Sequence, residues 1–430
     1  MILLKGVRVF DGEHLREGLF DILVEGKKIE RIAPKGSLSL GDGVKVIDLE
    51  GKIACPGFID IHVHLREPGG EWREEIKSGA LAAYYGGFTT IVAMPNTNPP
   101  IDSPELVRFV KLTGESVKGA RVLPSGSLSK GREGKELTEM RRMVNEGAVL
   151  FTEDGSPTVR TDLLRSAMLY LKDLGVRVME HPEDPYLSEN GQVNEGRVSA
   201  LSGLKGIPSS SELIDVERCI ILSRELDVPI HITHVSTKEA INAIRKAKEE
   251  GVKVTCDVTP HHLTLDEEKV LESGFDPVYK VRPPLRTRED IEALWEAIKN
   301  GVVDAIATDH APYHVDEKDL PFEDASSGIA SLECAVAVIL DAWDRRGRSI
   351  PLEKILRLFT SGPAKVLPER YRGLGYLREG GIADITVIDI DRVSVVDVSL
   401  WRSKARLTPW NGLSLKGWPV LTLVEGELIQ

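Results

Sequence analysis

The segment 58–66 reads FIDIHVHLR and places two histidines two positions apart in an apolar run. Successive side chains of a β-strand point to opposite faces, so His62 and His64 share one face while Val63 and Leu65 share the other. Two imidazoles that face one cavity are a typical pair of ligands for Zn²⁺ and similar ions. The alternative is a pair of core histidines, each bonded to a backbone partner. The other histidines of the chain decide between these interpretations.

Nine of the ten histidines lie at or just beyond the ends of short apolar runs, which is not the pattern of scattered core histidines. The nine are His62, His64, His181, His231, His234, His261, His262, His310 and His314. Imidazole and carboxylate ligands suit zinc, so we predict a metal-binding set that consists of His62, His64, His181, His234 and Asp309. A metal ion in such a set activates water, and the residues therefore indicate a metal-assisted hydrolase.

Three of the remaining histidines have other interpretations. His231 lies three residues before His234 and thus on the opposite side of a strand, where packing against helices is expected. His261 and His262 follow Pro260 in a predicted loop, where each either stabilises the loop or contacts a metal ligand.

Eight short apolar runs must position these side chains, and each is followed by a charged, helix-compatible stretch. The runs are GFIDIHVH, GFTTIVAMPN, ARVLPSG, GAVLFTEDG, GVRVMEH, VPIHITH, VKVTCDVTPHH and VDAIATDH. Stretches such as LWEAIKN and STKEAINAIRKAKEEG read as the intervening helices. Eight βα units predict an α/β fold that closes into a (β/α)₈ TIM barrel, with the active site at the carboxyl ends of the strands.

The two ends of the chain differ from this pattern. Residues 1–55 contain short alternating strands with glycine-bearing turns, and residues 371–430 contain similar segments such as GGIADITVIDI and WPVLTLVEGELIQ. We predict that both ends pair into one small β-sandwich domain beside the barrel. The predicted boundaries are 1–55 and 371–430 for the small domain and 56–370 for the barrel.

The composition limits the partners and the compartment. The 430 residues include 41% hydrophobic residues and carry a formal net charge of -12 without a Lys/Arg-rich run, so neither a nucleic acid nor a membrane is expected as a partner. The absence of a secretion signal and the four scattered cysteines favour the cytoplasm. Only two glutamines and eight asparagines occur, which favours a thermophilic source because these amides are thermolabile.

Several segments resemble those of a known enzyme family. GFIDIHVHLREPG, GGFTTIVAMPNTNPP, VTPHHLTL, PPLR and IATDHAP look like signature segments of the amidohydrolase superfamily, and in particular of the class I dihydroorotases. The resemblance runs through nearly the whole chain and includes the C-terminal KARLTPWNGLSLKGWPVLTLVEGELI. It implies the interconversion of dihydroorotate and N-carbamoyl-L-aspartate in pyrimidine synthesis, on one or two zinc ions per subunit.

The resemblance divides the metal ligands into two groups. His62, His64 and Asp309 match the residues that hold one ion, while His181 and His234 match the two histidines that hold the second. Asp309 is also the expected catalytic residue, because a carboxylate there can take a proton from the attacking water and pass it to the departing amide nitrogen.

Many relatives bridge the two ions with a carbamylated lysine. The corresponding segment GAVLFTEDG contains no lysine, and Asp154 matches the aspartate that some bacterial dihydroorotases use instead. A shorter aspartate reaches less far than a carbamate, so the number of ions stays open between one and two. Its neighbour Glu153 is expected to be a solvated loop charge.

Arg66 follows His64 by two positions and is expected to hold a substrate carboxylate. Its planar guanidinium can grip a carboxylate with two hydrogen bonds beside the metal, and Asn96 can add a further donor. The alternative is a salt bridge between Arg66 and Glu67 or Glu71.

Three places in the sequence depart from the pattern of most relatives. Arg282 stands where most have Asn, Tyr313 where most have His, and Ser327 and Gly328 where a Phe-Gly pair contacts the substrate ring. Arg282 adds a second cation for a carboxylate, whereas Tyr313 offers one neutral hydrogen bond in place of a charged one. The expected substrate contacts are His64, Arg66, Asn96, Arg282, Tyr313, Ser327 and Gly328.

Two other functions compete with this interpretation. A hydantoinase, dihydropyrimidinase or allantoinase shares the barrel and the metal ligands, but its substrate has no ring carboxylate for Arg66 and Arg282. A catalytically silent homologue that serves as a structural partner in a pyrimidine-pathway complex has no need of five metal ligands. A homo-oligomer and an association with other enzymes of the pathway are both compatible with the sequence.

Overall fold

Each of the eight apolar runs contains a β-strand in the computed structural model, which describes residues 1–39, 41 and 43–429. The strands are β6 (Phe58–Val63), β7 (Phe88–Ala93), β8 (Arg121–Pro124), β10 (Leu150–Thr152), β11 (Arg177–Glu180), β14 (Ile230–Ile232), β15 (Val254–Val258) and β16 (Ala305–Ile306). Hydrogen-bonded neighbours among them run parallel. The predicted α/β fold with parallel strands is confirmed.

The parallel strands form two ladders. β6, β7 and β8 make one sheet, and β16, β15, β14, β11, β10 and β9 (Gly126–Ser127) make the other. Only Ser125 separates β8 from β9 along the chain, and a parallel bridge between Val63 and His310 links the end of β6 to the segment after β16. The carboxyl ends of these strands therefore point in one direction. Two further short strands, β12 (Val193–Asn194) and β13 (Gly206–Ile207), pair with each other.

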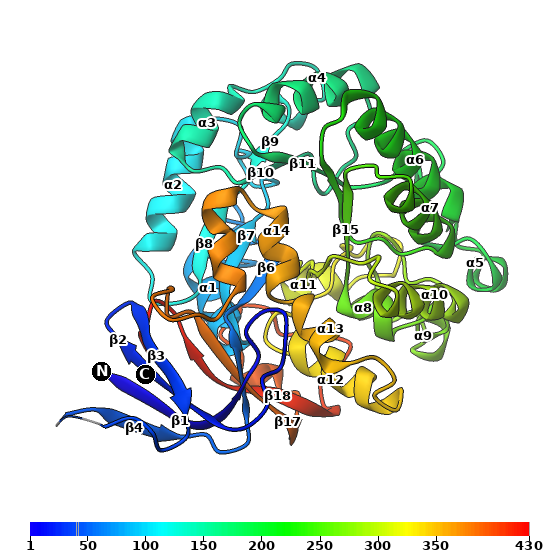
Figure 1. The fold of residues 1–430 in the computed structure, drawn as a ribbon. Helices are drawn as coiled ribbons and strands as arrows, with labels where there is room; N and C mark the ends of the chain where they lie inside the picture. The colour runs from blue at the N-terminus through cyan, green and yellow to red at the C-terminus, as the bar shows by residue number, and fades with distance from the viewer. Residues whose placement is uncertain (40, 42, 430) are drawn as a thin grey trace.

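Helices lie outside the parallel strands, as Figure 1 shows. They are α1 (Ile76–Tyr85), α2 (Pro104–Glu115), α3 (Met140–Glu146), α4 (Thr161–Lys172), α5 (Arg197–Ser202), α6 (Ser209–Leu226), α7 (Lys238–Glu249), α8 (Pro260–Thr264), α9 (Glu268–Glu272), α10 (Arg288–Lys299), α11 (Val315–Lys318), α12 (Ala335–Arg345), α13 (Leu352–Arg357) and α14 (Ser361–Val366). The two sequence stretches predicted as helices form α10 and α7, so that prediction is confirmed.

Helix α10 illustrates why such segments fold as amphipathic helices. Thr287 precedes it and forms a capping box with Asp290, which satisfies backbone N–H groups at the first turn. Ile291, Leu294 and Ile298 follow at spacings of three and four residues and are buried. This spacing places them on one face, which belongs to the main hydrophobic core.

The chain ends share one seven-stranded sheet. Its strands are β1 (Ile2–Val9), β2 (Phe20–Glu25), β3 (Lys28–Pro34), β4 (Lys45–Asp48), β5 (Ile53–Pro56), β17 (Ile385–Val395) and β18 (Ser414–Leu423). β5 joins the two ends because it pairs parallel to β1 on one side and antiparallel to β17 on the other. Figure 1 shows both termini beside β1–β3, away from the helices α4–α7.

Among the described residues, no helix is both long enough and apolar enough to cross a membrane.

Candidate active site

A cavity of about 280 Å³ lies at the carboxyl ends of the parallel strands. Its lining brings together nearly all the residues predicted from the sequence: His64, Arg66, Asn96, Asp154, His181, His234, Arg282, Asp309, Tyr313, Ser327 and Gly328. The remaining one, His62, is fully buried beside it and contacts Asp154 and Asp309. Lining residues up to 264 positions apart along the chain, from His64 to Gly328, thus meet because parallel strands all end at one side.

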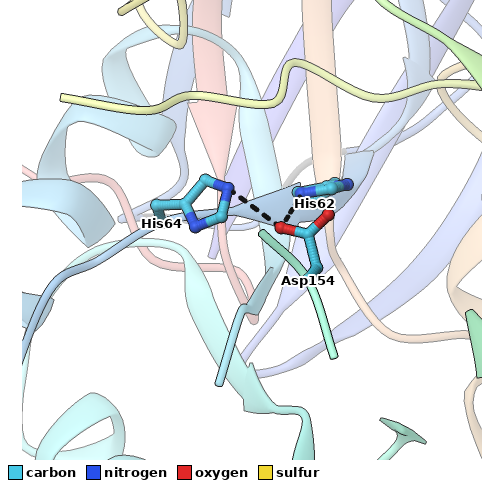
Figure 2. A group of neighbouring side chains, drawn as sticks. All are labelled: His62, His64 and Asp154. Carbon is cyan, nitrogen blue, oxygen red and sulfur yellow. Dashed lines mark hydrogen bonds and ion pairs between the residues drawn. The ribbon is translucent and has the colours of Figure 1, made fainter. Parts of the chain in front are cut away.

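His62 and His64 face one oxygen of Asp154, as Figure 2 shows. The Nε2 atoms of His62 and His64 lie 3.1 Å and 3.4 Å from Asp154 Oδ2. The same two nitrogens lie 3.5 Å and 3.1 Å from Oδ1 of Asp309. The alternation expected in β6 therefore aims both imidazoles at one point, together with two carboxylates.

The other two histidines face the second oxygen of Asp154. His181 Nδ1 and His234 Nε2 each lie 3.3 Å from Asp154 Oδ1 and only 2.8 Å from each other. Asp154 thus contributes to two groups of three ligand atoms, one with His62 and His64 and one with His181 and His234. Buried imidazoles and a carboxylate that converge in this way fit a borderline divalent cation.

The electrostatics of the cluster favour a cation. Burial raises the pKa of Asp309, but the charges of His62 and His64 outweigh it and hold that pKa well below its usual range. Burial lowers the pKa of His62, but Asp154 and Asp309 outweigh it and raise the pKa to about 9. Burial likewise opposes the hydrogen bonds and charges that raise the pKa of His181 to about 10. The two carboxylates therefore attract positive charge, whether from protons or from metal ions.

Three site residues have backbone φ angles in the left-handed region. They are Arg66 at 61°, His234 at 40° and Asp309 at 45°. Such conformations cost about 1–3 kcal/mol each for residues other than glycine, and they persist where the surrounding structure imposes them. The strain lies where the strands end and the side chains turn toward the cavity.

A chain of hydrogen bonds orients the histidines, and sequence reasoning missed its members. His62 Nδ1 lies 2.7 Å from the hydroxyl of Thr233, which donates to Asp257 Oδ2 at 2.9 Å. The backbone N–H of His234 donates to the other oxygen of Asp257 at 2.7 Å. Thr233 and Asp257 could have been identified as polar residues within the apolar runs that contain β14 and β15, since a buried polar side chain requires a hydrogen-bond partner.

Glu183 is a further residue that the sequence analysis missed. One carboxylate oxygen lies 3.4 Å from His181 Nε2, and the carboxylate accepts two hydrogen bonds from Arg282, one of them 2.6 Å long. Burial raises the pKa of Glu183, but His181 and Arg282 outweigh it and lower that pKa far below its usual range. The guanidinium of Arg282 is therefore already engaged by a carboxylate of the protein. The sequence feature that could have identified Glu183 is its place two positions after His181, a predicted metal ligand.

Arg66 lines the cavity and has no salt bridge to either of the acidic residues considered as alternatives. Glu67 accepts a hydrogen bond from the N–H of Ile76, and Glu71 accepts one from the N–H of Gly69. Among the described residues, no carboxylate oxygen lies within 4.0 Å of the Arg66 guanidinium. Asn96 Oδ1 accepts a hydrogen bond from His64 Nδ1 at 2.8 Å, which orients that ring.

The structure corrects two predictions about histidines outside the metal cluster. His231 contacts polar groups of the neighbouring strand, Thr255 at 2.9 Å and Asp257 at 2.9 Å, and not the helices. His261 and His262 belong to helix α8 and not to a loop, because Thr259 caps a short helix there by accepting from the N–H of His262.

Glu153 is also placed differently from the expectation. It is buried and accepts a hydrogen bond from the N–H of Ser129 at 2.5 Å, so the prediction of a solvated loop charge is wrong. The physical reason is that the backbone N–H of Ser129, after β9, is buried and takes the carboxylate that follows β10 as its acceptor.

Comparison with known proteins places the chain in a family. A sequence model described as dihydro-orotase-like matches residues 51–240. The dihydroorotase of Thermoanaerobacter sp. is 42% identical over 99% of this chain and 96% of its own length. The dihydroorotase of Aquifex aeolicus is 43% identical over 100% of this chain and 99% of its own.

Solved structures share the fold at lower sequence identity. The L-hydantoinase (dihydropyrimidinase) of Arthrobacter aurescens has a TM-score of 0.86 at 26% identity, and the match covers 100% of this chain and 95% of that one. The D-hydantoinase (dihydropyrimidinase) of a Thermus species has a TM-score of 0.83 at 23% identity over the same shares. The converging histidines and carboxylates thus occur in a hydrolase fold, and the whole-length relatives at 42% and 43% identity show that the chain belongs to the dihydroorotase family.

Proposed function

We propose that the chain is a zinc-dependent dihydroorotase that interconverts (S)-dihydroorotate and N-carbamoyl-L-aspartate in the de novo synthesis of UMP. The observation that carries the proposal is the position of Arg66 beside the metal-ligand cluster, with a guanidinium that no carboxylate of the described residues approaches within 4.0 Å. A cyclic amide that bears a carboxylate matches both features. The relatives named dihydroorotase, which match over the whole chain, support the same substrate.

The proposed metal ligands are His62, His64, Asp154, His181, His234 and Asp309. Zn²⁺ bound there would polarise the amide carbonyl and would lower the pKa of a bound water far enough for it to lose a proton near neutral pH. Because Asp154 belongs to both ligand groups, we propose one or two zinc ions per subunit.

Asp309 is the proposed proton carrier. Its carboxylate lines the cavity and is unprotonated because neighbouring histidines hold its pKa low, so an oxygen is free to take a proton from the attacking water. It then returns this proton to the amide nitrogen as the ring C–N bond breaks. His64 Nε2 lies 3.1 Å from this carboxylate and belongs to the same proposed group of ligands.

The proposed substrate contacts are His64, Arg66, Asn96, Arg282, Tyr313, Ser327 and Gly328. Arg66 takes the ring carboxylate through its two terminal nitrogens. Arg282 contributes mainly through its charge, because Glu183 already occupies its hydrogen-bond donors. The two arginines favour this reaction over that of a hydantoinase, dihydropyrimidinase or allantoinase, because the substrate rings of those enzymes carry no carboxylate.

A catalytically silent homologue is the second alternative. It is disfavoured because six ligand residues, four of them histidines, converge within a buried cluster that is costly to assemble without a cation. Association with other enzymes of the pathway, formation of a homo-oligomer and a cytoplasmic location stay predictions.

We further propose that the parallel strands close into an eight-stranded barrel of residues 56–370 and that residues 1–55 and 371–430 form a β-sandwich domain. The bridge between Val63 and His310 and the continuity of β8 with β9 support closure. The sheet shared by β1, β5 and β17 supports the small domain.

One assay tests the proposed function. Hydrolysis of dihydroorotate is compared with hydrolysis of hydantoin and allantoin, with the metal content measured on the same sample. We expect turnover of dihydroorotate, loss of this activity after chelation and its return with Zn²⁺. The activity should not depend on bicarbonate, because Asp154 occupies the position of the lysine that bicarbonate would carbamylate in many relatives. Full turnover by a sample shown to be free of metal contradicts the metal assignment, and a preference for hydantoin or allantoin replaces the substrate assignment.

A further inference from the structure

Tyr313 lies among three basic side chains at the wall of the cavity. The guanidinium carbon of Arg66 is 4.6 Å from the centre of the Tyr313 ring, and that of Arg73 is 5.1 Å away. The amine of Lys318 is 5.9 Å from the same centre. The face of an aromatic ring carries negative potential, so each of these contacts is attractive, and most so where water is excluded.

Arg66 depends on this ring for its orientation. Its side chain is buried, and among the described residues its guanidinium donates one hydrogen bond to the protein, from Nε to the carbonyl of Pro312 at 3.2 Å. One hydrogen bond leaves the guanidinium plane free to turn about it. The adjacent ring of Tyr313, 4.6 Å from the guanidinium carbon, restricts this freedom while Arg66 lines the cavity.

The ring of Tyr313 is itself held from several sides. Arg73 is tied to Glu317 through Nε at 2.9 Å and 3.0 Å, and Lys318 donates to the carbonyl of Pro277 at 2.9 Å. Gly328 leaves room for the ring, because a Cβ at that position would lie 2.8 Å from Tyr313 Cε2. A ring confined in this way can act as a fixed support for a flexible arginine.

We infer that Tyr313 is a positioning residue that orients Arg66 for the carboxylate of the substrate. The inference rests on the proposed function, because it assigns Arg66 to that carboxylate. It also gives Gly328 a steric role, to accommodate the ring, in addition to its place in the cavity lining. Arg66, whose guanidinium no carboxylate of the described residues approaches within 4.0 Å, makes this wall of the cavity positive, which favours an anionic ring over the neutral ring of a hydantoin.

The test compares Tyr313→Phe with Tyr313→Leu in the zinc-loaded enzyme. Phenylalanine keeps the aromatic face and loses only the hydroxyl, so we expect kcat/KM for dihydroorotate to fall less than in the leucine variant. Leucine removes it, and we expect kcat/KM to fall roughly 3- to 30-fold, mainly through KM, with unchanged zinc content. Tyr170→Leu on α4, where Tyr170 is exposed, is the matched control for the same substitution and should leave the kinetics unchanged.

A double-mutant cycle separates positioning of Arg66 from other roles. If Tyr313 acts through Arg66, Tyr313→Leu should cause no further loss in an Arg66→Ala enzyme. Should Tyr313→Leu fail to fold, Tyr313→Met provides a second route, because the unbranched, flexible side chain of methionine fills the space without an aromatic face and should raise KM in the same way.

Three results would overturn the inference. They are a Tyr313→Leu enzyme with normal KM, a Phe variant as impaired as the Leu variant, and an equal loss from Tyr313→Leu with and without Arg66. A wild-type enzyme that does not turn over dihydroorotate would instead overturn the proposed function, and the inference with it, so the two failures are distinguishable.

Discussion

At the scale of single residues, Asp154 is the central residue of the site. One of its oxygens faces His62 and His64, and the other faces His181 and His234. Each imidazole has a definite orientation because its other nitrogen or its backbone is held elsewhere, as with His62 on Thr233. Such outer contacts fix which ring nitrogen faces the ion.

Substitution of Arg66 tests the carboxylate contact directly. Arg66→Ala removes a charge-assisted contact in a buried site and should reduce kcat/KM for dihydroorotate about 30- to 1000-fold. This corresponds to a loss of roughly 2 to 4 kcal/mol of transition-state stabilisation. Arg66→Lys keeps the charge but loses the paired hydrogen bonds, so it should lie between alanine and wild type. Steady-state kinetics measures both, and metal content should not change. Near-normal efficiency of the alanine variant would show that the carboxylate is held elsewhere.

Glu183 should influence the metal through His181. Glu183→Gln removes the negative charge next to His181 Nε2 and leaves Arg282 without its partner, so we expect zinc affinity to fall about 10- to 100-fold. Competition with a chromophoric chelator measures the affinity. Glu189→Gln, an exposed carboxylate nearby, is the matched control. Equal zinc affinity in the wild type and Glu183→Gln would contradict this role.

At the scale of elements, two lysines fasten the segment 311–330 over the cavity. Lys318 in α11 donates to the carbonyls of Pro277 and Lys280 at 2.9 Å and 3.2 Å. Lys280 in turn donates to the carbonyls of Phe322 and Glu323 at 2.7 Å and 2.8 Å. These reciprocal contacts fix the loop that carries Tyr313, Ser327 and Gly328, although it contains only one turn of helix.

The buried Lys318 predicts a pH-dependent contribution to stability. Burial, and secondarily the charge of Lys280, lower the pKa of Lys318 from 10.5 to about 7. Between these two values the unfolded chain binds more protons than the folded one, so stability rises with pH across that window. Below pH 7 both states are protonated, and the cost of burying the charge is fully present.

Lys318→Met should remove this dependence. We expect the unfolding free energy of the wild type to rise relative to the variant between pH 7 and about 10, by up to about 1.4 kcal/mol per pH unit. Urea denaturation at several pH values measures the difference, and Lys354→Met, which removes a lysine bonded to a surface carbonyl, is the matched control. Parallel curves for the wild type and Lys318→Met would contradict the prediction.

At the scale of the whole molecule, a buried ion pair joins the parallel strands to the terminal sheet. Arg121 in β8 donates to Asp384, next to β17, at 2.7 Å and to Glu425 at 3.1 Å. The side chain of Asp384 is almost fully buried. The pair links segments 263 residues apart, so the two parts of the chain are expected to unfold together.

Arg121→Ala should destabilise the molecule strongly. It leaves the buried Asp384 without its cation, which typically costs about 3–5 kcal/mol of unfolding free energy. Denaturant titration measures the loss and shows whether one transition remains. Arg108→Ala, which removes an exposed pair with Glu146, should have a much smaller effect. An equally small loss in Arg121→Ala would show that the link is not structurally important.

The composition also agrees with the sources of the relatives. The scarcity of glutamine and asparagine predicts a thermophilic source, and relatives from thermophiles such as Thermoanaerobacter and Aquifex match the chain over at least 99% of its length.

The sequence by itself determined the ligand types and the strand pattern. His62 and His64 share a face because the side-chain period of a strand is two, and the eight polar-ended runs locate the site because parallel strands end on one side. The resemblance to a family added Asp154, which no periodicity distinguishes from Glu153. These inferences succeeded because they depend on local geometry and on residue type.

Only the tertiary structure decided which side chains meet across the cavity. Glu183 engages Arg282 from 99 residues away, and Tyr313 supports Arg66 from a loop with almost no regular structure. Glu153 turned inward because a distant backbone donor needed an acceptor. Such contacts depend on how loops fold over the ends of the strands, and neither hydrophobic periodicity nor residue spacing carries that information.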